Sequence, residues 1–265
     1  MVAQTIDLPN VKRIFLPDPS YFICDSDLAQ ADAQVVAWDA GVKPLMEFFE
    51  AAKDDPALDL HGQNAADIFG GPPTKSNPHR AKAKAGVHAV NYDVKAKTLA
   101  EALGVTVREA DEFIDLWFSK HPDIYEWQQR IKVQMETTRV ITNRFGNRKV
   151  FFGRTGRALP EALAWIPQST VALVINRAWR RIEDLGLHKD IQVLLQVHDS
   201  LVYQVRKTSF RRVLPLIEEA FHVPVPYAQP LTIPAGLEYS PLSWGDCKAS
   251  DWQGNLELEG EVLGA

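Results

Sequence analysis

The sequence predicts an α+β fold in which a helical segment is inserted between parts of an antiparallel sheet. Short apolar runs bounded by turn residues, which are typical of strands, occur near both ends of the chain. Segments with helical spacing of apolar residues fill the middle. The 265 residues are 46% hydrophobic and 24% charged, which suffices for one large domain or two small ones and excludes a disordered or collagen-like chain.

The expected strands lie at the start of the chain and beyond its middle. A Pro-Asp-Pro turn separates the first two strands, and a His-Asp pair separates two later ones. The predicted strands cover residues 11–16, 21–26, 191–197, 201–205 and 231–238.

The expected helices occupy most of the remaining chain. The segment 70–78, rich in glycine and proline, interrupts them, and the proline at position 167 predicts a kink or break in the longest helix. The predicted helices cover residues 31–38, 44–52, 59–69, 80–90, 97–103, 106–118, 123–137, 160–185 and 210–221.

Composition limits the compartment and the class of partner. Cys24 and Cys247 give neither a disulfide framework nor a zinc quartet, so we expect a reducing compartment. The N-terminus lacks the apolar core of a signal peptide, and no run of 18 apolar residues predicts a membrane span. The net charge is −5, yet residues 139–157 contain six bases and no acid, and 75–84 form a second basic block. Each block fits a groove for phosphates or an ordinary solvated surface equally well.

Two aspartate motifs follow strand-like segments. Asp25 and Asp27 end the strand that begins at residue 21, and His198-Asp199 lies between two apolar strands. A carboxylate at the end of a strand suits a hard cation such as Mg²⁺. Two simpler interpretations stay open, namely that one aspartate caps the following helix and that His198 and Asp199 are ordinary turn residues.

A third motif places Arg80, Lys84, His88 and Tyr92 at intervals of four residues along one helix. Residues at this spacing lie close to one helix face. Two cations followed by two rings suit a triphosphate and then its sugar and base, although a solvated basic face has the same pattern. Together the three motifs supply the parts of two-metal phosphoryl transfer.

These residues resemble the family A DNA polymerases along nearly the whole chain. Motif A, usually DYSQIELRVLA, is similar to DSDLAQADAQVVA at residues 25–37, and motif C, usually QVHDELV, is similar to QVHDSLV at 196–202. The fingers patterns D-x-H-x-x-x-A and R-x3-K-x3-[FY]-x3-Y resemble DLHGQNAADIFG and RAKAKAGVHAVNY. TNRFGNRKVFFGR resembles the stretch that contains T-x-x-G-R-R, and ALAWIPQSTVA resembles a helix that touches the DNA minor groove.

The resemblance implies a palm at residues 1–41 and 139–265, which ends in an acidic tail, and helical fingers at 42–138. It implies template-directed addition of deoxynucleotides to a primer 3′ end. We expect no thumb and no exonuclease in this chain, because the chain begins where the thumb usually ends. The implied partners are primer-template DNA, dNTPs and a separate thumb or exonuclease subunit, without a membrane, in the cytoplasm of a bacterium or a phage-infected bacterium.

The family's functional residues transfer to positions that match its motifs. Asp27 and Asp199, helped by the Leu28 carbonyl, are implied to hold two Mg²⁺ ions, and Lys84 is implied to act in catalysis with them. The implied DNA-binding residues are Arg148, Gln168 and His198. The implied nucleotide-binding residues are Leu28, Gln30, Asp32, His61, Arg80, Lys84, His88 and Tyr92.

Five positions depart from the family pattern, namely Asp32, Gln34, His88, Asp93 and Ser200. Asp32 stands where the family has the glutamate that excludes ribose, His88 replaces an aromatic residue, and Ser200 replaces a glutamate. Two alternative functions therefore stay open: a non-catalytic remnant that binds DNA or a partner, and a small gap-filling polymerase with relaxed sugar selection.

Overall fold

The computed structural model describes residues 10–55, 57–258 and 261–262. Its helices and antiparallel strands form two compact units, and the α+β class predicted from the sequence is confirmed. The predicted division into palm and fingers at residues 41/42 and 138/139 stays a prediction. The first unit comprises Met1–Ala29, Ala172–Pro224 and Thr232–Ala265, and the second comprises Gln30–Val171 and Val225–Leu231.

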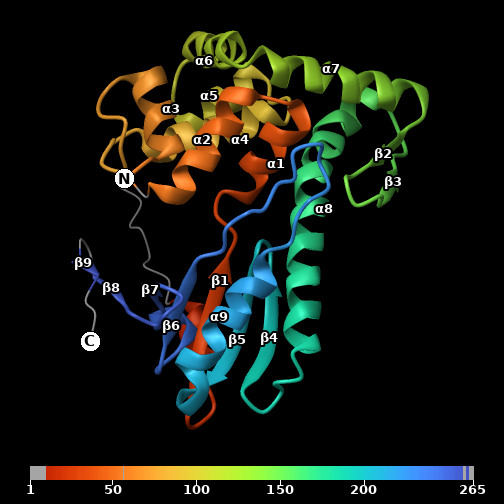
Figure 1. Ribbon diagram of the computed structural model, residues 1–265. Coiled ribbons are helices and arrows are strands. Elements are labelled where there is room, and N and C mark those ends of the chain that lie inside the picture. Colours follow the sequence, from red (N-terminus) through yellow and green to blue (C-terminus); the bar gives the residue numbers. More distant parts are fainter. Residues whose placement is uncertain (1–9, 56, 259–260, 263–265) are drawn as a thin grey trace. The chain divides into compact units, whose positions relative to one another are not determined.

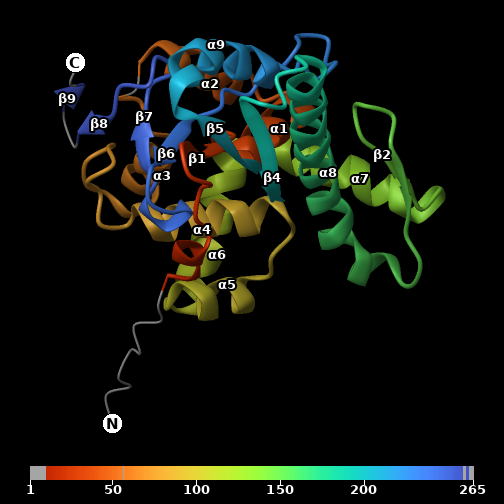
Figure 2. The ribbon, with the colours of Figure 1, turned by 90° about the horizontal axis from the view of Figure 1, so that it is seen from below.

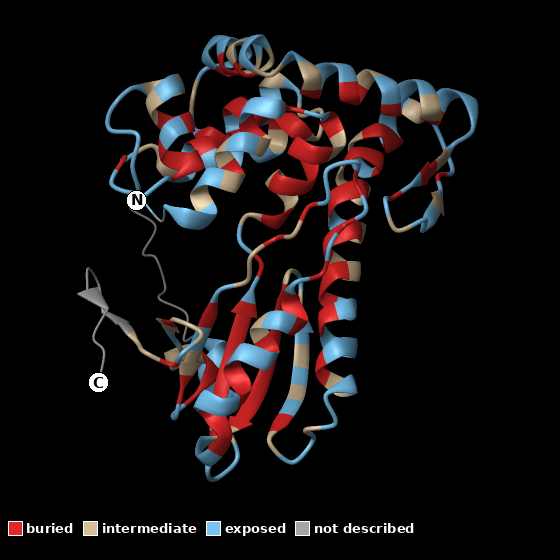
Figure 3. Ribbon diagram, viewed as in Figure 1, coloured by how far each residue is buried: buried red, intermediate tan, exposed pale blue. Residues whose placement is uncertain are grey.

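A five-stranded antiparallel sheet forms the centre of the first unit (Figure 1). Its order is β4-β5-β1-β6-β7. β1 and β5 are buried along nearly their whole length, whereas β4, an edge strand, is buried only at Ile191 and otherwise alternates between exposed and intermediate positions (Figure 3). The strands are β1 (Tyr21–Asp27), β4 (Ile191–Val197), β5 (Ser200–Arg206), β6 (Leu237–Ser240) and β7 (Lys248–Ser250).

Helix α9 (Phe210–Phe221) covers one face of this sheet, as Figures 1 and 2 show. Its buried side chains recur every three or four residues, which gives the helix one apolar face. The Phe210 ring packs 4.7 Å from the rings of both Phe22 on β1 and Tyr239 on β6, measured between centroids. Because side chains alternate along a strand, Ile23, Asp25 and Asp27 point to the opposite face.

Short elements complete the first unit. Trp244 packs against Ile23 and Val202 on the face opposite α9. The remaining elements are the 3₁₀ helices η1 (Val11–Ile14), η2 (Lys207–Ser209) and η3 (Trp244–Asp246), and the strand pair β8 (Glu257–Leu258) and β9 (Glu261–Val262).

The second unit is mainly helical, and local sequence signals start and stop its helices. Asp59 caps α3 through the Gly62 amide, and Thr106 with Glu109 forms a capping box on α6. The elements are α1 (Ala31–Ala40), α2 (Lys43–Asp54), α3 (Leu60–Phe69), α4 (Arg80–Asn91), α5 (Ala96–Leu103), α6 (Val107–Lys120), α7 (Pro122–Thr137), β2 (Val140–Thr142) and β3 (Arg148–Val150).

Three contacts fix α4, the helix that carries the predicted cation stripe. Gly86 lets α4 approach α6 closely, because a Cβ there would lie 2.5 Å from the Phe113 ring. The indole of Trp117 donates to Asn91 Oδ1 at 2.9 Å, and the Gln128 amide donates to the Val90 carbonyl at 2.8 Å. The helix is therefore held along its length by α6 and α7.

Helix α8 (Thr155–Asp184) is continuous through Pro160 and Pro167, so the break that was one of the two predicted outcomes does not occur. Pro167 lacks an N–H and so removes one helical hydrogen bond, but Leu163 and Ile166 beside it are almost fully buried. Their burial outweighs the lost bond. Among the described residues, α8 is the one helix long and apolar enough to cross a membrane, and 56% of its most apolar window is buried, a property shared by core helices.

Two predicted strands differ from the structure. Residues 11–16 contain η1 instead, because Asn10 accepts a hydrogen bond from the Lys12 amide and the segment pairs with no named strand in the part of the chain described. Of the predicted strand at 231–238, only the end enters β6, while Leu231 bridges back to Val225. Apolar alternation alone did not distinguish these loops from strands.

Candidate active site

Two carboxyl groups meet at the end of β1. Asp27 is the last residue of this strand, and Asp199 lies in the two-residue turn between β4 and β5. Asp27 pairs in register with Ser200, and the next amide, that of Leu28, donates to the Asp199 carbonyl oxygen at 3.0 Å. Sheet pairing therefore brings together the two aspartates that the sequence predicts as metal ligands.

The carboxyl groups of this pair repel one another. The pKa of Asp27 is raised to about 7 by partial burial, then by the negative charge of Asp199 and a hydrogen bond with its side chain, and further by Asp25 and Glu238. Asp27 nevertheless stays exposed to solvent. Two carboxylates held this close are stabilised by a cation between them, and their oxygens are the donors that Mg²⁺ prefers.

A cavity of about 580 Å³ opens over the pair. Its lining combines the two aspartates with further ionisable groups from β1, β6, η1 and the turn between β4 and β5. These groups are Lys12, Asp25, His198 and Glu238. His198, which the resemblance places at the primer terminus, is exposed and has a left-handed backbone (φ 52°) in the tight turn.

Asp25 has structural partners of its own. Its Oδ2 atom accepts a 2.6 Å hydrogen bond from the Trp244 indole and lies 3.8 Å from the Lys12 ammonium. That ammonium also stands 4.3 Å from the centre of the Trp244 ring. Asp25 thus links β1 to η1 and η3, and Asp27 is the aspartate that meets Asp199.

The donor set fits a divalent cation that keeps water in its coordination shell. No group of three or more His, Cys, Asp or Glu side chains within the described residues is arranged to hold a metal by itself. The predicted set has two carboxylates and one backbone carbonyl, and Mg²⁺ commonly takes only one or two carboxylates, with waters and substrate phosphates completing the shell.

A second group of predicted residues lies in the other unit, on α3 and α4. Arg80 forms a two-pronged ion pair with Asp59, its Nε and Nη2 atoms donating to the two carboxylate oxygens at 2.6 and 2.8 Å. Burial alone would raise the pKa of Asp59, but the bonds from Arg80 and the Gly62 amide lower it. The sequence-predicted phosphate ligand Arg80 is therefore fixed by a carboxylate that caps the neighbouring helix.

His61 follows Asp59 on α3 and faces the same cations. It is only 7% exposed, and burial, followed by the charges of Lys84 and Arg80, lowers its pKa to about 4. The ring is therefore neutral at pH 7. Lys84 itself is exposed. The neutral imidazole of His61 therefore lies near two cations, the Lys84 ammonium and the Arg80 guanidinium.

The two aromatic residues of the predicted α4 motif, His88 and Tyr92, lie near Asp32, the residue predicted to select the sugar. Tyr92, which lies just past the end of α4, donates from its hydroxyl to Asp32 Oδ2 at 3.3 Å. Burial and then the Asp32 charge raise the pKa of Tyr92. The exposed His88 ring packs against Tyr92 edge to face, with centroids 4.7 Å apart. The tyrosine thus connects α4 to α1.

The remaining predicted residues are distributed over other elements of the second unit. Gln30 precedes α1 with a left-handed backbone (φ 48°), Arg148 is exposed on β3, and Gln168 is exposed on α8. The predicted metal group, Asp27, Leu28 and Asp199, belongs to the first unit together with His198.

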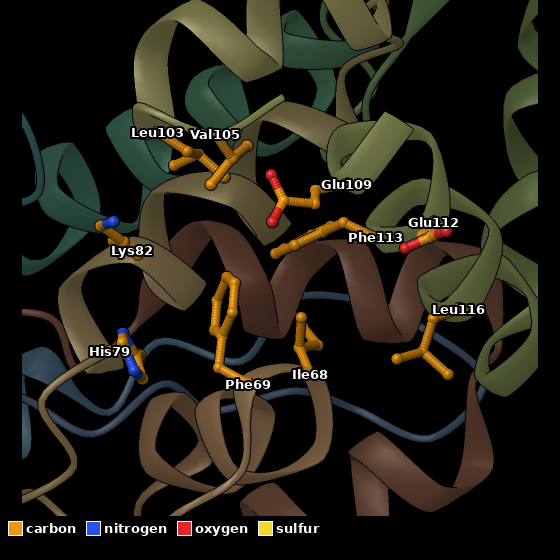
Figure 4. A pocket seen from close by; sticks show the side chains of 10 residues that line it. All are labelled: Ile68, Phe69, His79, Lys82, Leu103, Val105, Glu109, Glu112, Phe113 and Leu116. Carbon is orange, nitrogen blue, oxygen red and sulfur yellow. The ribbon is translucent and has the colours of Figure 1, made fainter. Parts of the chain in front are cut away.

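A separate cavity of about 460 Å³ lies among α3, α5 and α6 (Figure 4). Phe69 and Phe113 form much of its wall, and the carboxylates at its edge, Glu109 and Glu112, already bind Thr106 and Arg108. None of the site residues predicted from the motifs lines this cavity, and it is smaller than the cavity over Asp27 and Asp199.

Sequence reasoning missed Asp59, Trp244 and Lys12. Asp59 has the N-cap signal, an aspartate directly before a helix, but nothing local predicts its pairing with Arg80. Trp244 and Asp25 are 219 positions apart, so only the folded sheet joins them.

Comparison with known proteins shows the same family along the chain. Residues 3–241 match the family described as DNA polymerase family A. The chain is 27% identical over 239 residues to a thermostable DNA polymerase I of Thermus filiformis, covering 86% of this chain and 28% of that protein. It is 26% identical over 264 residues to DNA polymerase I of Rhizobium leguminosarum, covering 94% of this chain and 25% of that protein.

A solved structure has a similar fold. The POL domain of an M. smegmatis polymerase, in complex with DNA primer-template and dNTP, superposes with a TM-score of 0.75 at 22% identity, covering 92% of this chain and 45% of that one. This likeness concerns the fold. The chain spans about a quarter of the length of the curated relatives it matches.

Proposed function

Because the chain belongs to DNA polymerase family A, we propose that it adds deoxynucleotides to the 3′ end of a primer under the direction of a template strand. The observation that carries this proposal is the meeting of Asp27 and Asp199 at one end of the sheet, in an oxygen-lined cavity. The ion-paired Arg80 and the buried His61 beside Lys84 support it as a site for phosphates.

In this reaction the primer 3′ hydroxyl attacks the α-phosphate, and the bond to pyrophosphate breaks. Asp27, Asp199 and the Leu28 carbonyl would hold two Mg²⁺ ions, which supply positive charge that acidifies the hydroxyl and stabilises the leaving group. Arg80 and Lys84 bind phosphate oxygens and offset their charge, and the neutral His61 donates a hydrogen bond to them.

Other side chains orient the two substrates. Asp32 and Tyr92 contact the sugar of the nucleotide, with Gln30 and His88 beside it. Arg148, Gln168 and His198 contact DNA. The bacterial relatives support a site of action in a bacterial or phage-infected cytoplasm.

As a finer part of the proposal, a separate subunit supplies the thumb or exonuclease. Exposed apolar side chains at one edge of the first unit support it, because a surface of this kind is typical of protein contacts. They are Val11, Ile14, Leu16 and Leu242, each at least 65% exposed.

The test is primer extension by the purified chain with Mg²⁺ and dNTPs, at low salt and with enzyme in excess over primer, so that weak DNA binding does not limit the signal. We expect extension by the wild-type chain, none by Asp27→Asn or Asp199→Asn, and wild-type extension by Asp184→Asn, a matched change on the exposed part of α8. Absence of wild-type extension, or its survival in both site variants, would overturn the proposal.

A further inference from the structure

An aromatic side chain projects from the second unit directly after the β2–β3 hairpin, which follows α7 in Figure 1. Phe152 is 87% exposed, more than any other large hydrophobic residue in the described part of the chain. Its neighbour Phe151 is 3% exposed, so the backbone anchors one ring inside and turns the next one out.

The backbone holds this arrangement with two hydrogen bonds. The Phe151 amide donates to the Arg139 carbonyl at 2.9 Å, and the Arg139 guanidinium donates to the Gly153 carbonyl at 2.6 Å. Arg139 has a left-handed backbone (φ 57°), which is costly for a residue with a Cβ. Gly153 is also left-handed (φ 98°), at no such cost because it has no Cβ. Arg139 therefore binds the residues on both sides of the exposed ring, and its own strained backbone is of the kind that gathers at functional sites.

The charged side chains of the segment that carries the ring are all basic. No acidic residue occurs from Arg139 to Arg157. Lys149 and Arg144 in this segment pair with Glu161 and Asp39 from other elements. Three other arginines have no side-chain hydrogen bond or ion pair to any described residue, namely Arg148, Arg154 and Arg157.

We propose that Phe152 stacks on a base of an unpaired DNA strand, while Arg154 and Arg157 bind the flanking phosphates. An exposed aromatic ring between unpaired cations has the chemistry of single-strand binding surfaces, in which rings take bases and cations take the backbone. Inside a duplex the base faces are covered by the neighbouring pairs, and only the two ends are open, so single-stranded DNA fits this surface better than blunt duplex does. The proposal rests on the proposed function in one respect, because only the proposed polymerase activity identifies the bound strand as the template ahead of the primer.

The test measures DNA binding by the full chain without dNTP, using fluorescence anisotropy. The probes are a single strand, a primer-template with a 5′ overhang and a blunt duplex of equal length. We expect Phe152→Ala to weaken binding of the first two probes by about five-fold or more, and of the duplex by less than two-fold. Phe152→Trp keeps a stacking surface and should retain wild-type affinity. Leu216→Ala, which removes a 40% exposed side chain from the other unit, is the matched control and should leave all three affinities unchanged.

A second readout reports stacking directly. 2-Aminopurine placed in the overhang loses fluorescence when an aromatic ring stacks on it, and this quenching should disappear with Phe152→Ala. The double variant Arg154→Ala/Arg157→Ala should lower the dependence of log affinity for the single strand on log salt by about 1.4, about 0.7 for each phosphate contact.

Equal loss of duplex and overhang binding, or no loss with Phe152→Ala, would overturn the proposal; the latter outcome would favour a protein partner at this ring. The inference and the proposed function fail separately, because binding is measured without catalysis. Asp199→Asn should abolish extension yet keep the full effect of Phe152→Ala on overhang binding.

Discussion

The repulsion between Asp27 and Asp199 predicts how the first unit responds to Mg²⁺. A cation that binds only the folded chain at ten times its dissociation constant adds about 1.4 kcal/mol to the free energy of unfolding. We therefore expect saturating Mg²⁺ to raise the melting temperature by about 2–4 °C or more, measured by scanning fluorimetry.

The same two side chains supply the control for this measurement. Asp27→Asn removes one of the repelling charges, so it should raise the melting temperature without Mg²⁺ and abolish the further rise with it. An equal Mg²⁺ effect in wild type and Asp27→Asn would place the cation elsewhere on the surface. Asp184→Asn should respond as the wild type does.

The bond between Tyr92 and Asp32 predicts sugar selection. Asp32 is one methylene shorter than the glutamate usual in the family, and the tyrosine hydroxyl draws its carboxylate toward α4. One methylene is worth about ten-fold or more in selectivity. We expect Asp32→Glu to lower the ratio of ribonucleotide to deoxynucleotide incorporation by that factor, measured as kcat/KM for each nucleotide. An unchanged ratio would remove Asp32 from the sugar site.

The junction of α3 and α4 depends on one carboxylate. Asp59 is 4% exposed, caps α3 and binds Arg80 with both oxygens. Asp59→Ala removes the cap and the ion pair together and should lower the free energy of unfolding by about 2–3 kcal/mol.

Asp59→Asn separates the two roles, because an asparagine still caps the helix but carries no charge. We expect it to cost about half as much as the alanine, with urea denaturation as the measurement. Equal losses in the two variants would show that the cap contributes little and that the ion pair with Arg80 accounts for the stabilisation.

The elements that sequence reasoning predicted best are those whose signals are local. Helix α9 was predicted at its observed bounds, and α4 to within one residue, because their apolar residues recur at helical spacing. Residues 11–16 have strand-like composition, but a strand also needs a neighbour, and the five-stranded sheet has none for them. Pro167 predicted a kink or break in α8. The helix is unbroken there, and the burial around the proline, which favours the helix, is a tertiary property that the local sequence does not reveal.

In the candidate site too, the residues within sequence motifs were predictable, whereas their partners from distant parts of the chain were not. The sequence motifs identified Asp27 and Asp199, and the pairing of β1 with β5 places them together. The partners that tune the site come from distant segments: Asp59 for Arg80, and Trp244 with Lys12 for Asp25. Their contacts depend on packing of whole elements, for which no local spacing exists.

The two units should respond to acid in opposite directions. In the second unit, the pKa values of His61 and His121 are lowered to about 4, mainly by burial. The unfolded chain binds protons at these rings near pH 6.5 and the folded unit does not, so its stability falls as the pH drops from 6.5 toward 4. In the first unit, the pKa of Asp27 is raised to about 7 and that of Glu238 is raised too, so the folded state binds more protons and stability grows over the same interval.

Differential scanning calorimetry at pH 7.5 and pH 5.0 tests this difference. At pH 5.0 we expect the unfolding of the second unit to move to lower temperature and separate from that of the first. The double variant His61→Gln/His121→Gln should lose the downward shift, because neither ring remains to be protonated on unfolding. Asp27→Asn should reduce the gain in stability that the first unit shows at pH 5.0. A single transition that moves down as a whole in every variant would mean that other groups govern the acid response and that the opposed shifts of His61 and Asp27 do not control stability.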